Sequence, residues 1–291
     1  MIAQYGLREG AMHRLLAFIT ALVALVSGVS LVSRVANIDL MALGPVYMFS
    51  PLAAAVVVCY VSGLRLQTVG LRLGNWRWSI IAAVMWPPIT LVIAGVSLLA
   101  PGVWFDPSLI VSETGVPHTP LWLLIGFLGL TAFTMLMGVT LNAVFAFGEE
   151  FGWRGYLLWE LAPLGFWKAS ILIGAVWGLW HAPLVAAGLN YPSFPILGIA
   201  VFTLVCIVVS PIFTYVVLKG RSVLPAVFLH GVFNAISFAA LAQTDSDVLR
   251  ELVASEGGLA GLVVFTGILW VMWHAGTPEV SEELPTGGVR G

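Results

Sequence analysis

Long apolar runs separated by short polar connections are the dominant pattern of this sequence. The runs lack the period-two alternation that marks the strands of a membrane barrel. Because lipid offers the backbone no hydrogen-bond partners, apolar runs of this length predict helices that cross a membrane. The sequence therefore predicts an all-α polytopic membrane bundle of about eight transmembrane helices. The predicted spans cover residues 15–33, 41–63, 79–100, 121–147, 166–188, 196–218, 223–243 and 258–276.

Composition excludes two broad classes of protein. Hydrophobic residues make up 60% of the chain and charged residues only 9%, whereas charged residues form about a quarter of a soluble domain. The net charge of −2 and the absence of a basic block exclude nucleic acid as a partner. We expect residues 1–276 to form a single transmembrane domain in the lipid bilayer, with its first apolar run retained as a helix. The tail 277–291 is rich in Pro, Gly and Glu and is expected to be disordered.

The basic residues predict how the bundle is oriented, because Lys and Arg accumulate in cytoplasmic connections. With a cytoplasmic amino terminus and eight crossings, only Arg34 and Arg250 fall outside. Both termini are then cytoplasmic, the connection around Glu149 lies toward the cytoplasmic side, and a bacterial inner (plasma) membrane is the expected location. The inside set comprises Arg8, Arg14, Arg65, Arg72, Arg77, Arg154, Lys168, Lys219, Arg221 and Arg290.

Ionisable groups within or against membrane spans are costly and therefore candidates for function. Here they gather in three places in the second half of the chain, within about residues 140–245. Glu150 and Arg154 are four residues apart and can pair on one helix face, which leaves Glu149 as a free carboxylate on another face. The three groups are Glu149, Glu150 and Arg154 in F-G-E-E-F-G-W-R, His181 four residues after Trp177 in W-G-L-W-H-A-P, and His230 with Asn234 in L-H-G-V-F-N.

Each cluster taken alone has a structural explanation. The Glu149 cluster fits a solvated helix end, His181 fits a buried structural histidine, and His230 with Asn234 fits an interhelical hydrogen bond. Their coincidence favours chemistry, because together they supply what hydrolysis of a peptide bond requires. Glu149 and His181 can activate a water. His230 and Asn234 can donate hydrogen bonds to the oxyanion that forms.

Two alternatives remain open at this point. Glu149, His181 and His230 could share a Zn²⁺ ion with an open coordination position, although the H-E-x-x-H pattern is absent. The preferred mechanism needs no cofactor. The same groups could also form a proton relay or a structural polar core in a membrane transporter or scaffold.

At these residues the sequence resembles the CPBP family of intramembrane endopeptidases, which includes CAAX prenyl proteases and bacteriocin-processing proteins. The family pattern is E-E-x-x-x-R, then an aromatic residue four before His, then H-x-x-x-N. The resemblance implies that Glu149 and His181 activate water, that His230 and Asn234 form the oxyanion hole, and that the other motif residues support them. It also implies a membrane-associated, possibly prenylated, protein or peptide as substrate. The supporting residues are Glu150, Arg154 and Trp177. At the position of Trp177 the family usually has Phe.

Overall fold

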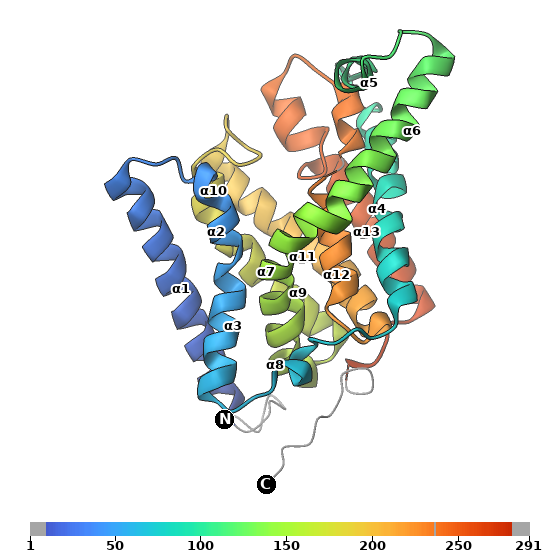
Figure 1. Ribbon diagram of the computed structural model, residues 1–291. Coiled ribbons are helices and arrows are strands. Elements are labelled where there is room, and N and C mark those ends of the chain that lie inside the picture. The colour runs from blue at the N-terminus through green and yellow to red at the C-terminus, as the bar shows by residue number, and fades with distance from the viewer. Residues whose placement is uncertain (1–9, 236, 281–291) are drawn as a thin grey trace.

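The computed structural model describes residues 10–235 and 237–280, which are helical over most of their length (Figure 1). The predicted fold class, an all-α polytopic bundle, is confirmed. The expected disordered tail lies outside the described residues from position 281 onward. The α-helices are α1 (Ala11–Ala36), α2 (Gly44–Met48), α3 (Ser50–Val61), α4 (Trp76–Ser97), α5 (Ser108–Thr114), α6 (Pro120–Met137), α7 (Ala143–Glu150), α8 (Leu158–Leu161), α9 (Phe166–Trp180), α10 (Ala182–Ala186), α11 (Pro195–Gly220), α12 (Leu224–Phe233) and α13 (Leu259–Ala275).

Short segments of other geometry connect or extend these helices. The two strands pair antiparallel and join loops that lie far apart in the sequence. The 3₁₀ segments are η2 (Met41–Leu43), η3 (Leu66–Val69), η6 (Ala162–Leu164) and η7 (Phe238–Leu241), the π-helical segments are η4 (Gly138–Asn142), η5 (Phe151–Leu157) and η8 (Val248–Val253), and the strands are β1 (Trp104–Phe105) and β2 (Ala242–Gln243).

The chain is an integral multi-pass membrane protein. Among the described residues, 6 helical segments are long and apolar enough to cross a membrane. The shorter apolar helices α12 and α13 fall within the two remaining predicted spans. The long segments are Ala11–Ala36, Met41–Val61, Trp76–Ser97, Pro120–Leu164, Phe166–Ala186 and Pro195–Gly220.

Two predicted spans differ from the structure. The helix expected at 121–147 continues without a break to Leu164, because Glu150 and Arg154 neutralise each other inside the bundle and need no water at a helix end. The span expected at 223–243 ends as a helix at Phe233. Beyond it the backbone forms a 3₁₀ turn and then hydrogen-bonds with β1. The prediction of a single helix over 223–243 is therefore wrong.

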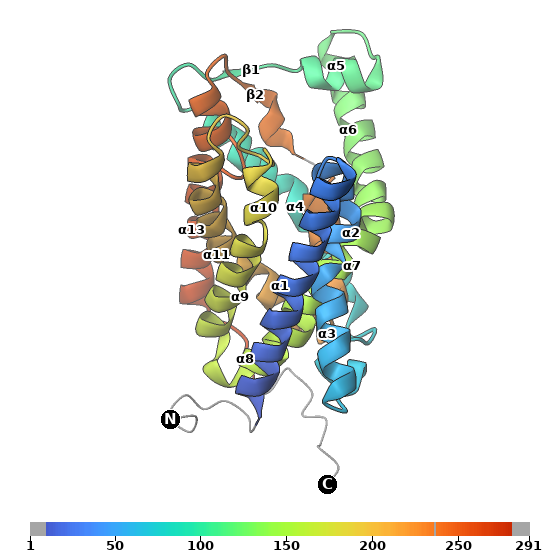
Figure 2. The same ribbon diagram turned by 90° about the vertical axis from the view of Figure 1, so that its left-hand side faces the viewer.

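The bundle has two ends, which we name lower and upper as they stand in Figure 1. At the lower end α1 begins beside α8, where Arg14 forms an ion pair with Glu160. The backbone N–H of Asn75 donates to the carbonyl of Gly220 at this same end, 2.7 Å away. Figure 2 shows β1, β2, α5 and α10 at the upper end.

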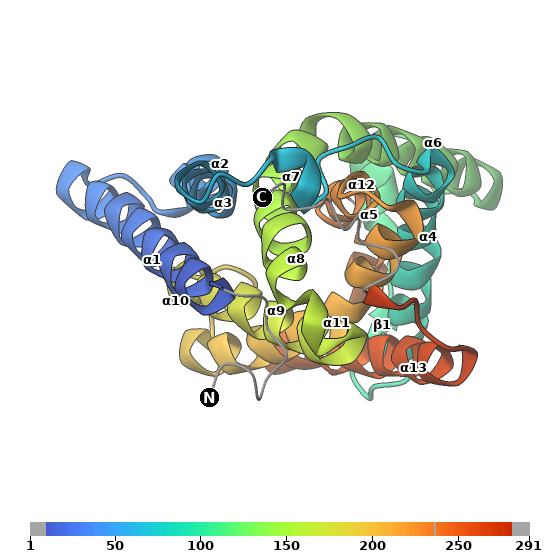
Figure 3. The same cartoon turned by 90° about the horizontal axis from the view of Figure 1, so that it is seen from below.

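The fourth spanning segment runs through the centre of the molecule. Seen from below, α7 and α8 lie between α1–α3 on one side and α4, α12 and α13 on the other (Figure 3). Glycines allow this close approach: a Cβ on Gly148 would lie 2.7 Å from the carbonyl oxygen of Met48, and one on Gly152 would overlap Pro51. Small residues four apart are a common device for close helix contacts in membranes. This contact fixes the helix that carries Glu149 and Glu150.

Candidate active site

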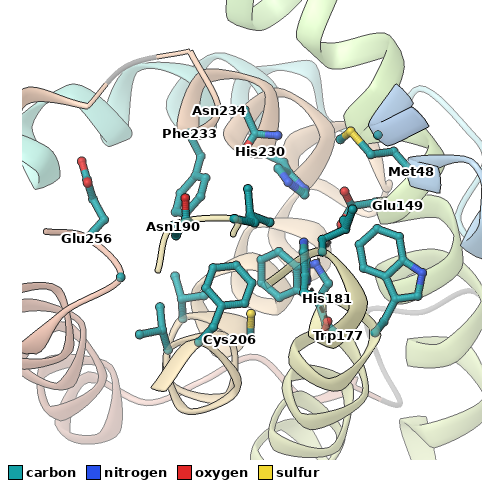
Figure 4. A pocket seen from close by; sticks show the side chains of 18 of the residues that line it. Met48, Glu149, Trp177, His181, Asn190, Cys206, His230, Phe233, Asn234 and Glu256 are labelled. Atoms are coloured by element: carbon teal, nitrogen blue, oxygen red, sulfur yellow. Dashed lines mark hydrogen bonds between the residues drawn. The ribbon is translucent and has the colours of Figure 1, made fainter. Parts of the chain in front are cut away.

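A cavity of about 480 Å³ extends from the centre of the bundle, and the four proposed catalytic side chains line it (Figure 4). Glu149 comes from α7, His181 from the end of α9, and His230 and Asn234 from α12 and its C-terminal cap. Most of the remaining wall is apolar. It includes Met48, Trp86, Phe202, Val205, Cys206 and Phe233.

Glu149 is buried, with only 1% of its surface exposed. The sequence predicted a free carboxylate, with a solvated helix end as the structural alternative. The structure instead places it in the bundle, where its Oε2 accepts a hydrogen bond of 2.8 Å from the indole Nε1 of Trp177. This bond fixes one carboxylate oxygen.

Glu150 pairs with Arg154 as the four-residue spacing predicted, at 3.0 Å from Oε1 to Nη1. It also accepts a hydrogen bond of 2.7 Å from Nδ1 of His230, a contact that the sequence did not predict. Arg154 lies between the rings of Trp177 and Phe213, with its Cζ 4.4 and 4.6 Å from their centroids. All these side chains are buried. Glu150 therefore holds both a guanidinium and one of the proposed catalytic imidazoles.

Trp177 connects the parts of the site. Besides its bond to Glu149, its ring centroid lies 5.9 Å from that of His181 and 5.5 Å from that of His230. A single indole thus contacts both imidazoles and the carboxylate. The contact with His181 follows from the four-residue spacing at the end of α9, whereas the contacts with Glu149 and His230 join α9 to α7 and α12, so the motif spacing did not contain those two.

The hydrogen bonds of the two histidines determine which ring nitrogen carries a proton. Nδ1 of His181 lies 2.9 Å from the backbone carbonyl oxygen of Trp177. A carbonyl oxygen only accepts, so Nδ1–H donates and Nε2 of neutral His181 keeps a lone pair. By the same argument Nδ1–H of His230 donates to Glu150, because a carboxylate only accepts. Nε2 of His230 can donate only when the ring is an imidazolium.

Asn234 lies one helical turn beyond His230 at the end of α12. Its backbone N–H donates to the carbonyl of His230 at 2.9 Å, and its exposed side chain lines the cavity. The helix end therefore presents an amide to the space beside the imidazole (Figure 4).

The alternative zinc site would require Glu149, His181 and His230 to converge on one ion. Within residues 10–235 and 237–280, no group of three or more His, Cys, Asp or Glu side chains is arranged to hold a metal ion. Glu149 and His230 are instead directed to hydrogen bonds with Trp177 and Glu150.

Several residues near the site were not predicted from the sequence. Ser210 accepts a hydrogen bond of 3.3 Å from Nη2 of Arg154, and Phe213 covers the same guanidinium. The only sequence signal for Ser210 is a polar residue next to a proline inside an apolar run. Tyr191, Ser237 and Glu256 line the cavity from loops that carry no motif.

Comparison with known proteins finds a family match over the part of the chain that holds the site. Residues 131–236 match the family model described as "Type II CAAX prenyl endopeptidase Rce1-like". A similar protein is CAAX prenyl protease 2 of Methanococcus maripaludis, 34% identical over 129 residues. That alignment covers 42% of this chain and 45% of the relative, so the chain matches less than half of the relative's length. All the motif residues, from Glu149 to Asn234, lie within the family match.

Proposed function

We propose that this chain, whose residues 131–236 match the Rce1-like CAAX prenyl endopeptidase model, is an intramembrane endopeptidase that uses Glu149 as its base. Its substrate is a membrane-associated protein or peptide. The observation that carries the proposal is the convergence of Glu149, His181, His230 and Asn234 on one cavity inside an apolar bundle.

Glu149 and His181 activate the attacking water. The carboxylate oxygen of Glu149 takes a proton from the water as its oxygen attacks the scissile carbonyl carbon. Nε2 of His181 accepts a hydrogen bond from the second O–H of the water, because Nδ1–H is already directed to the carbonyl of Trp177. When the tetrahedral intermediate collapses, the C–N bond breaks and the departing amine takes the proton from Glu149.

His230 and Asn234 stabilise the oxyanion. The amide of Asn234 donates one hydrogen bond, and Nε2–H of protonated His230 donates the other. Protonated His230 also balances the buried charges: Glu149 and Glu150 are then opposed by Arg154 and His230. A buried group of four charges with a net charge of zero avoids the high cost of an unpaired charge. No metal takes part in these steps.

The proposal is tested with purified protein in detergent and an internally quenched, farnesylated peptide that ends in a CAAX-type sequence. We expect the wild type to cleave it, and Glu149→Gln and His181→Ala to lose cleavage while retaining their thermal unfolding temperatures. Glu113→Gln in exposed helix α5 is the matched control and should keep full activity. A chelator should leave the rate unchanged.

Full activity in Glu149→Gln would exclude this mechanism. Loss of activity with a chelator, followed by recovery with Zn²⁺, would replace the glutamate-dependent mechanism with a metal-dependent one. An orientation with both termini in the cytoplasm of a bacterial inner (plasma) membrane is part of the proposal, supported by the basic residues at the lower end of the bundle.

A further inference from the structure

The connections that line the catalytic cavity all belong to one end of the bundle. Besides the helices that carry the proposed catalytic residues, the lining includes residues of the connections at the upper end. They are Met41 and Gly44 before and in α2, Leu189, Asn190 and Tyr191 after α10, and Ser237, Ser255, Glu256 and Gly257 between α12 and α13. Figure 4 shows Asn190 and Glu256 on the far side of the cavity from Glu149.

The lower end is closed beneath the site. Among the described residues, none that lines the cavity comes from the lower connections at 62–75, 162–165 or 221–223. Phe151, Trp153, Tyr156 and Leu157, which follow the Glu149 motif toward that end, are at most 2% exposed. The cavity therefore reaches the outside of the bundle toward its upper end.

Basic residues accumulate at the other end. Of the described Lys and Arg residues in or beside the connections, only Arg34, at the end of α1, and Arg250, in η8, belong to the upper end. The lower end holds the first turns of α1, α4 and α9, the η3 connection and the end of α11 (Figure 1). Its basic residues are Arg14, Arg65, Arg72, Arg77, Lys168, Lys219 and Arg221.

The position of the basic residues defines the cytoplasmic end. Cytoplasmic connections of membrane proteins carry an excess of Lys and Arg, and the rule holds for short connections such as these. The lower end is accordingly cytoplasmic. The upper end, with the mouth of the cavity, faces the opposite compartment.

We propose that the catalytic cavity opens to the non-cytoplasmic side of the membrane. The inference rests on the proposed function and names its substrate class: apolar peptide segments that have been translocated, or that are anchored in the membrane with the scissile bond toward that side. It reverses the expectation that the active site faces the cytoplasm. That expectation placed Glu149 in a cytoplasmic connection, whereas it lies within a helix and is reached from the upper end.

Cysteine labelling tests the orientation independently of activity. Ser112→Cys places a thiol on exposed α5 at the upper end, and the matched Ser62→Cys places one after α3 at the lower end. The wild type, whose Cys59 and Cys206 are buried, gives the background. With a membrane-impermeant maleimide, we expect labelling of Ser112→Cys in intact spheroplasts and loss of labelling for Ser62→Cys until the membrane is permeabilised. The reverse pattern, or equal labelling of both, overturns the proposal.

Membrane vesicles test access to the site. The farnesylated quenched peptide is added outside right-side-out vesicles and outside inverted vesicles that hold equal amounts of protein. Cleavage by right-side-out vesicles with loss of cleavage in inverted ones supports the proposal, and the opposite result overturns it while the proposed function stands. If detergent-solubilised protein does not cleave the peptide, the proposed function fails, and the labelling still decides the orientation.

Discussion

At the scale of single residues, Trp177 is the side chain that holds the candidate site together. Phenylalanine at this position could provide the ring contacts to His181 and His230, but only an indole can donate a hydrogen bond to Glu149. The bond fixes the direction of the carboxylate and leaves its second oxygen for water. We therefore propose Trp177 as a positioning residue that acts through Glu149.

Replacing Trp177 with Phe separates the hydrogen bond from the ring. A hydrogen bond to a charged group contributes about 1.5–3 kcal/mol, so we expect kcat to fall by about 10- to 100-fold. KM should remain close to the wild-type value, because the ring still fills the wall. Steady-state kinetics in detergent measure both constants. Trp270→Phe, on an exposed part of α13, is the matched control. An unchanged kcat, or a rise in KM alone, would show that the indole N–H does not position the base.

The sequence contained part of this site and lacked the rest for a physical reason. Spacing within one helix predicted the pair of Glu150 and Arg154, because residues four apart on a helix face each other. The bond between Glu150 and His230 joins residues 80 positions apart. Such a contact depends on how two helices pack against each other, so the spacing within either motif does not predict it.

At the scale of elements, apolar patterning predicted where helices occur better than where they end. The helix that carries Glu149 passes through its charged motif without interruption, because Arg154 and His230 provide buried partners for Glu150. The apolar pattern of the sequence does not reveal such partners. The π-helical geometry of η5, directly after Glu150, was not predicted either. π-helical turns are rare and are often found at functional sites.

Gly231 provides a test of how α12 is placed. It follows His230, and a Cβ here would overlap the carbonyl oxygen of Gly138 in η4 and lie 2.9 Å from the backbone nitrogen of Ala143. Because backbone atoms cannot move aside easily, Gly231→Ala should destabilise the protein by about 1–3 kcal/mol and displace His230. We expect a lower unfolding temperature in detergent together with reduced cleavage.

Gly129 is the matched control for this substitution. It lies on an exposed face of α6, and a Cβ there would meet no atom within 4 Å. Gly129→Ala should therefore leave stability unchanged or slightly raised, since Ala favours helix over Gly by up to about 1 kcal/mol. Similar unfolding temperatures for the two variants would contradict a close contact between α12 and η4.

At the scale of the whole molecule, contacts between distant loops shape the mouth of the cavity. β1 pairs with β2, and the hydroxyl of Tyr191 donates a hydrogen bond of 2.6 Å to the carbonyl oxygen of Gly257. Basic residues in the sequence predicted which end of the bundle is cytoplasmic. They contained no information on which end the cavity opens toward, because its mouth is built from loops without motifs that meet only in the folded bundle.

Tyr191 is fully buried, and its bond joins two loops that both line the cavity. Tyr191→Phe removes only the hydroxyl, so the lost hydrogen bond of about 0.5–1.5 kcal/mol loosens the mouth without changing the catalytic groups. We expect KM to rise by about 2- to 10-fold, with kcat unchanged, and faster limited proteolysis between α12 and α13. Tyr60→Phe, at an exposed position of α3, should match the wild type in both measurements. If Tyr191→Phe lowered kcat at constant KM, the two loops would be acting on the catalytic residues rather than on substrate entry.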